Sequence, residues 1–125
     1  YMTIQDNLLE GTAKLLNNEA FNLPSHTAVS TDSTLAITTD MSSLSGEAGA
    51  RLAASGSRVD NVLTFNSLRS GTAVLDTTNG DTLYGLALFN ASTGVEILEA
   101  VLLPGLTQTT SFDIDFDIDM TISRP

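Results

Sequence analysis

Residues 112–122 read FDIDFDIDMTI, with an apolar residue at every second position. Four aspartates and Thr121 occupy the positions between them. A period of two is typical of a β-strand that buries one face and leaves the other in water. In an α-helix, which turns by about 100° per residue, the aspartates would be spread around the axis. The stretch therefore predicts a closing strand that needs a second apolar layer, and its dry face carries Phe112, Ile114, Phe116, Ile118, Met120 and Ile122.

The length and composition indicate one soluble domain. A chain of 125 residues is long enough to hold a single two-layer core. It contains no cysteine, so disulfides and thiolate metal sites are excluded. No run of about 18 apolar residues occurs, and the first residues lack the pattern of a signal peptide. We therefore expect a soluble protein without a membrane partner.

The charge balance is strongly acidic. Fifteen acidic residues and five basic ones give a formal net charge of −10, and Lys14 is the sole lysine. A phosphate backbone or an acidic membrane surface would be repelled by such a chain, so neither is an expected partner. Two interpretations of the charge stay open. The aspartates either form an ordinary solubilising surface or are an adaptation to high salt, where self-repulsion is screened.

Turn signals divide the second half of the chain into short apolar segments. Asn79-Gly80 is the strongest hairpin signal, residues 90–94 predict another turn, and Pro104-Gly105 is expected to end a strand. The predicted strands are 62–68, 72–76, 82–89 and 95–103, with weaker candidates at 26–30 and 35–38. This spacing, without helix-length connections, favours antiparallel pairing. The predicted fold class is all-β, mainly an antiparallel β-sandwich of jelly-roll or immunoglobulin-like arrangement, with one N-terminal helix.

The N-terminal residues 3–18 are the helix candidate. Apolar residues recur there at helical intervals, and Thr3 and Asp6 have the spacing of a capping box. Gly11 lowers the helix propensity by about 1 kcal/mol relative to alanine. We expect the helix to pack on the sheet, the alternative being an arm that docks on a neighbouring subunit. The domain organisation is a helical segment over 1–20 followed by one β-sandwich domain over 21–125.

Residues 40–57 are dominated by Ser, Gly and Ala. Only Met41, Leu44 and Leu52 are large apolar residues in this stretch, too few for a core strand. We therefore expect an exposed loop, or an arm that another subunit holds in place.

The sequence contains no pattern from which we would propose a catalytic or metal-binding site. His26 is the sole histidine, and no Gly-x-Ser-x-Gly motif is present for a Ser-His-Asp triad. The aspartate row is not an EF-hand, because its sixth position lacks glycine and its twelfth is Arg124 where glutamate is required. We expect a protein that is not an enzyme and that has no cofactor or metal.

The run YGLALFNASTG at residues 84–94, followed by a second strand and a long alternating strand, resembles small structural proteins of tailed viruses. The resemblance covers about residues 58–122, and Glu47 and Arg51 fall where such proteins carry an acidic residue and an arginine. It implies a non-enzymatic virion protein that assembles on a capsid or tail as a decoration, turret or fibre component. The implied partners are other virion proteins and copies of itself in a homo-oligomer, with a halophilic host if the charge reflects high salt. The candidate interface residues are Leu8, Leu15, Met41, Leu44, Arg51 and Leu52.

An alternative function from another class is a carbohydrate-binding or receptor-binding module. Its ligand would be held by the loops at 79–81 and 90–94. Tyr84 is the aromatic residue near these loops on which a sugar ring could stack.

Overall fold

The computed structural model describes residues 2–69, 80–94, 96–111 and 113–124, which form two antiparallel sheets and one helix. The elements are β1 (Thr3–Ile4), α1 (Asp6–Leu16), β2 (His26–Ser30), β3 (Glu47–Ala53), β4 (Ser55–Val59), β5 (Val62–Arg69), β6 (Thr82–Phe89), β7 (Ile97–Thr107) and β8 (Ile114–Thr121). The predicted all-β sandwich with one N-terminal helix is confirmed.

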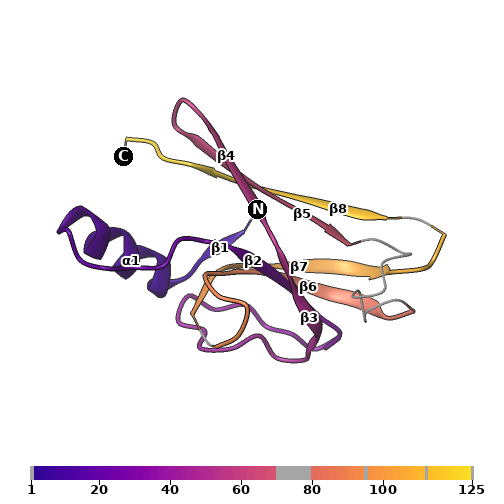
Figure 1. The fold of residues 1–125 in the computed structure, drawn as a ribbon. Coiled ribbons are helices and arrows are strands. Elements are labelled where there is room, and N and C mark those ends of the chain that lie inside the picture. The colour runs from indigo at the N-terminus through magenta and orange to yellow at the C-terminus, as the bar shows by residue number, and fades with distance from the viewer. Residues whose placement is uncertain (1, 70–79, 95, 112, 125) are drawn as a thin grey trace.

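The two sheets lie one over the other (Figure 1). The first sheet has the strand order β1-β7-β6-β2-β3, and the second sheet has the order β4-β5-β8. The chain passes from the first to the second sheet at Ala54, between the consecutive strands β3 and β4. Helix α1 projects from one end of the sandwich (Figure 1).

Strand β8 has the alternation that its sequence predicts. It pairs with β5 over its whole length, from Arg69↔Ile114 to Val62↔Thr121. Ile114 and Ile118 are buried in the core between the sheets, whereas the aspartates of the strand are exposed. Ile122 lies past the end of the strand and is 68% exposed, so its predicted burial is wrong. Phe112 lies outside the described residues.

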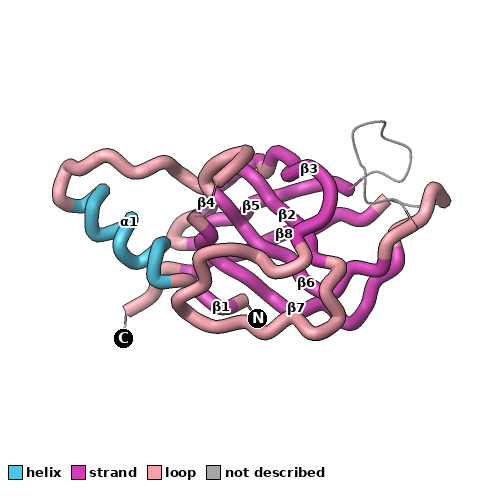
Figure 2. Tube along the Cα trace, turned by 90° about the horizontal axis from the view of Figure 1, so that it is seen from below, coloured by secondary structure: helices cyan, strands magenta, loops and turns pink. Residues whose placement is uncertain are grey.

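The first sheet is covered on both faces. Its inner face packs against the second sheet through the inner core, which contains Val29, Phe65, Leu83, Leu86, Leu88, Ile114 and Ile118. Its outer face is covered by the segment between β2 and β3 (Figure 2), and this outer core contains Ala28, Leu35, Leu44, Ala87, Phe89, Ile97 and Ala100. Leu35 is thus a core residue of a loop, and the predicted strand over 35–38 does not form.

The expectation of a loop or arm over 40–57 is wrong from residue 47 onward. Residues 47–53 are β3, at the edge of the first sheet, and residues 55–59 are β4, at the edge of the second. Every residue of β4 is exposed. Edge strands of this kind are held by backbone hydrogen bonds to one neighbour, which an apolar-residue pattern does not reveal.

Strand β7 runs through Pro104-Gly105, which were expected to end it. Strand β1 pairs with β7 only at Glu99 and Ala100, so the missing N–H of Pro104 breaks no ladder bond on that side. Gly105 has φ +88° and lies in the register shift opposite Tyr84. A bulge with glycine therefore replaces the predicted stop. The predicted strand over 82–89 is confirmed, while the strand over 72–76 and Asn79 of the hairpin signal lie outside the described residues.

Helix α1 is shorter than predicted because β1 occupies the start of the segment. Thr3 pairs with Ala100, and Gln5 is the N-cap residue, so the predicted Thr3–Asp6 capping box does not form. The helix packs on its own chain: Asn7 Nδ2 donates to the Ile97 carbonyl at 3.4 Å. Among the described residues, no helix is long and apolar enough to cross a membrane.

Candidate functional site: an apolar groove beside helix α1

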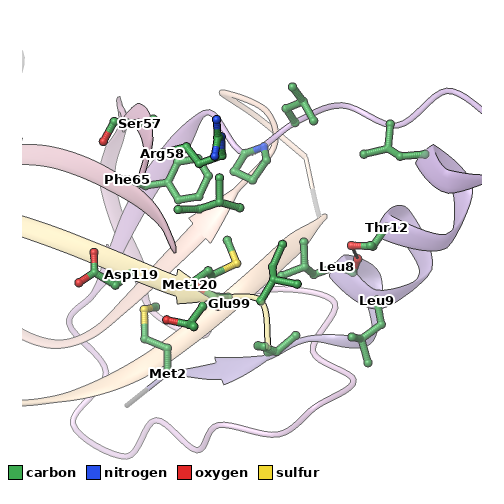
Figure 3. Close-up of a pocket in the computed structure, with 18 of the residues that line it drawn as sticks. Met2, Leu8, Leu9, Thr12, Ser57, Arg58, Phe65, Glu99, Asp119 and Met120 are labelled. Carbon is green, nitrogen blue, oxygen red and sulfur yellow. Dashed lines mark hydrogen bonds between the residues drawn. The ribbon is translucent and has the colours of Figure 1, made fainter. Parts of the chain in front are cut away.

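An open groove with a cavity of about 990 Å³ lies between helix α1 and the second sheet. Figure 3 shows Leu8 and Leu9 of α1 on one side, and Phe65 and Met120 of the sheet on the other. The groove is the unclosed end of the inner core, because Phe65 and Met120 also contact that core. The volume is at the upper end of the range of pockets that bind small ligands or side chains of a partner.

Large apolar side chains of the groove are open to solvent. They come from segments distant in sequence, and the exposed fractions are 44% for Ile4, 62% for Leu9, 44% for Leu15, 65% for Leu23 and 68% for Ile122. A single exposed apolar residue is ordinary, but a contiguous group of them on a concave surface marks a binding site.

Gln5 holds helix α1 in position at the groove. Its side chain is fully buried and donates from Nε2 to the Thr38 carbonyl at 2.6 Å, while its Oε1 accepts from the Met41 N–H at 2.9 Å. The backbone N–H of Gln5 donates to the Leu98 carbonyl at 2.9 Å. The start of the helix is thus fastened to β7 and to the loop that covers the outer core.

One buried carboxyl group, that of Glu99, belongs to the groove. Glu99 pairs with Leu88, an inner-core residue, whereas Ile97 pairs with Phe89 of the outer core. The extra residue Leu98 forms a bulge between these pairs, and this bulge places Glu99 on the inner face. Without it, residues 97 and 99 would share a face.

The environment of Glu99 is unfavourable for a charge. The residue is 2% exposed, and its Oε2 has no hydrogen-bond partner among the described residues. Burial raises the pKa of Glu99 to about 7. Among the described residues that line the groove, the other charged ones are Arg58 and Asp119. Arg58 donates to the Asp60 carbonyl and Asp119 accepts from the Thr64 hydroxyl, so both have partners elsewhere.

The structure separates the interface residues predicted from sequence. Leu8 and Leu15 line the groove. Leu44 is buried in the outer core with Met41 packed against that core, and Leu52 is half-buried on β3, where it pairs with Thr27.

Arg51 is engaged within the chain. Its guanidinium lies 3.5 Å from the ring centroid of Phe89 and forms an ion pair with Glu47 at 2.9 Å. It also donates to the carbonyls of Ala91 and Gly94, so it fastens the 90–94 loop to strand β3. This loop is one of the two that a sugar ligand would use in the carbohydrate-binding alternative.

The aspartate row and His26 have ordinary structural contacts. Asn66 Nδ2 donates to Asp115 at 2.6 Å and to Asp117 at 2.8 Å, across the pair β5–β8. His26 Nδ1 lies 2.8 Å from the Ser25 hydroxyl. Within the described part of the chain, no group of three or more His, Cys, Asp or Glu residues is arranged to hold a metal ion.

Sequence reasoning missed Glu99 and most of the groove. One signal was present, because Glu99 lies within the apolar run Ile97–Leu103, where a carboxyl group has no obvious role. No comparable signal marked Leu9, Leu23 or Ile122, since the groove forms only when α1, the segment before β2 and the end of β8 come together.

Comparison with known proteins gives no relative: no family model, no curated protein and no solved structure matches this chain.

Proposed function

We propose that the chain is a non-enzymatic virion structural protein that assembles on a capsid or tail and uses the groove beside α1 to bind its neighbours. The observation that carries this proposal is the group of exposed apolar side chains along the groove. The virion setting comes from the resemblance of residues 84–94 and the strands that follow. Other virion proteins and copies of the chain itself are the proposed partners.

The energetics favour a partner on this surface. Burying a large apolar side chain is worth roughly 1.5–3 kcal/mol. These five side chains, Ile4, Leu9, Leu15, Leu23 and Ile122, are already partly buried, so a neighbour that covers their exposed parts gains roughly 4–8 kcal/mol of gross burial. The cost of association is subtracted from this gain. A groove of this kind is therefore suited to holding an assembly together.

The test compares two leucines of α1. Leu9 lines the groove, whereas Leu16 is 86% exposed and does not line it. We expect the purified chain to self-associate in about 1 M salt, where its charges are screened, and Leu9→Asp to abolish this association while Leu16→Asp leaves it unchanged. Light scattering measures the mass of each variant, and circular dichroism checks its fold. Equal association of wild type and Leu9→Asp would contradict the proposed role of the groove.

A further inference from the structure

Glu99 gives the groove a chemical preference. Its carboxyl group is almost completely buried among apolar residues, and its Oε2 has no hydrogen-bond partner among the described residues. In Figure 3 it lies between Met2 and Met120, within the groove. A buried acceptor without a partner is costly, and a donor brought by the occupant would remove that cost. A positively charged donor would also pair with the carboxylate.

We propose that the groove binds a segment of a different virion protein in which a lysine is flanked by apolar residues, and that the lysine ammonium bonds to Glu99. This inference rests on the proposed function. The apolar residues of the segment cover Leu9 and Leu23, and the flexible lysine side chain reaches the carboxyl group. Lysine fits better than arginine, because a guanidinium brings five donors into a groove with few acceptors.

The chain itself is a poor source of this lysine. Its sole lysine, Lys14, lies 3.8 Å from Glu10 on the same helix. Three of its four arginines, Arg51, Arg58 and Arg69, donate to carbonyl groups within the fold. Without the screening of about 1 M salt, a second copy would also bring a further net charge of −10 to the contact. A basic segment of another protein has the complementary charge.

The experiment uses two synthetic peptides with blocked ends. One has the sequence GLLKLLG, and the other replaces the lysine with acetyl-lysine, which keeps the four-carbon stem and removes the positive charge. We expect isothermal titration calorimetry to show about tenfold tighter binding of the lysine peptide to the wild-type chain. Glu99→Gln should abolish this preference. The control Asp117→Asn also removes one negative charge, but from β8 outside the groove, and should keep the preference.

Proton release provides a second readout. At pH 6 Glu99 is mostly protonated, so pairing with an ammonium must release a proton to the buffer. Titrations of the wild-type chain in buffers of different ionisation enthalpy measure this release, and the acetyl-lysine peptide should cause none. These two arms use the wild-type chain alone, so they test the inference even if Glu99→Gln does not fold.

Each other outcome overturns the inference. Equal binding of the two peptides would show that the groove binds apolar segments without help from Glu99, and the proposed function would stand. Binding of dodecylamine that depends on Glu99, without binding of the lysine peptide, would show a site for a small amphiphile. If neither probe binds, the inference fails but the proposed function does not, because the comparison of self-association between wild type and Leu9→Asp tests that function separately.

Discussion

A close contact with Phe21 explains why position 11 of helix α1 is a glycine. Gly11 appears from the sequence as a weakness in the helix. In the structure a Cβ atom at Gly11 would lie 2.2 Å from the ring of Phe21, so the glycine allows that ring to pack on α1. The glycine lowers helix propensity by about 1 kcal/mol relative to alanine, but any other side chain at this position would clash with the Phe21 ring. Glu99 is a second residue whose role the sequence pattern does not show, since only the bulge at Leu98 turns it toward the groove.

Glu99 should make the stability of the protein depend on pH. Its pKa is about 7 in the folded chain and 4.5 when exposed, so the folded state retains a proton that the unfolded state releases. The contribution of Glu99 to the free energy of unfolding should therefore be largest below pH 4.5 and should fall by up to about 3 kcal/mol as the pH rises to 7. Glu99→Gln should remove most of this slope and be more stable than wild type at pH 8. Urea unfolding at several pH values measures both effects.

The pH range of this measurement matters because Asp32 changes the free energy of unfolding in the opposite direction, lowering it as the pH falls. Hydrogen bonds from Thr34 and Ser45 hold the pKa of Asp32 below its usual value of 3.8, so its contribution is lost only in stronger acid. Measurements between about pH 5 and 8 avoid that range. A slope in Glu99→Gln equal to that of wild type would mean that another group titrates.

At the scale of elements, the two faces of β8 should respond differently to substitution. Ile118 is 2% exposed in the inner core, and Asp117 is exposed on the other face. Ile118→Ala should lower the free energy of unfolding by about 2–5 kcal/mol, because it removes buried methyl groups and leaves a cavity. Asp117→Asn should change it by less than about 1 kcal/mol. Chemical denaturation of both variants measures the contrast, and a large loss for Asp117→Asn would show that the aspartate face is buried by a partner.

The sequence predicted the elements that carry their own pattern. Strands β6 and β8 were found because their apolar residues meet the core, and β5 was found for the same reason. Strands β3 and β4 were missed because edge strands are held by backbone bonds, which are the same for Ser and Gly as for Val. The groove could not be predicted, since Leu9, Phe65 and Ile122 meet only in the folded chain.

At the scale of the whole molecule, the acidic charge should limit stability at low salt. The acidic residues that give the net charge of −10 repel one another in the compact chain. Three of them, Asp115, Asp117 and Asp119, lie at alternate positions of β8. Raising the salt from about 0.01 M to 1 M shortens the screening length from about 30 Å to 3 Å. We therefore expect the midpoint of thermal unfolding to rise with salt. The triple change of these aspartates to asparagine should raise the midpoint at low salt and flatten its salt dependence. Calorimetry of both chains in sodium chloride measures this, with sodium sulfate as a control for ion-specific effects on apolar burial. A midpoint that falls with salt would show that attraction between charges outweighs repulsion, and the acidic surface would then have no destabilising effect for salt to relieve.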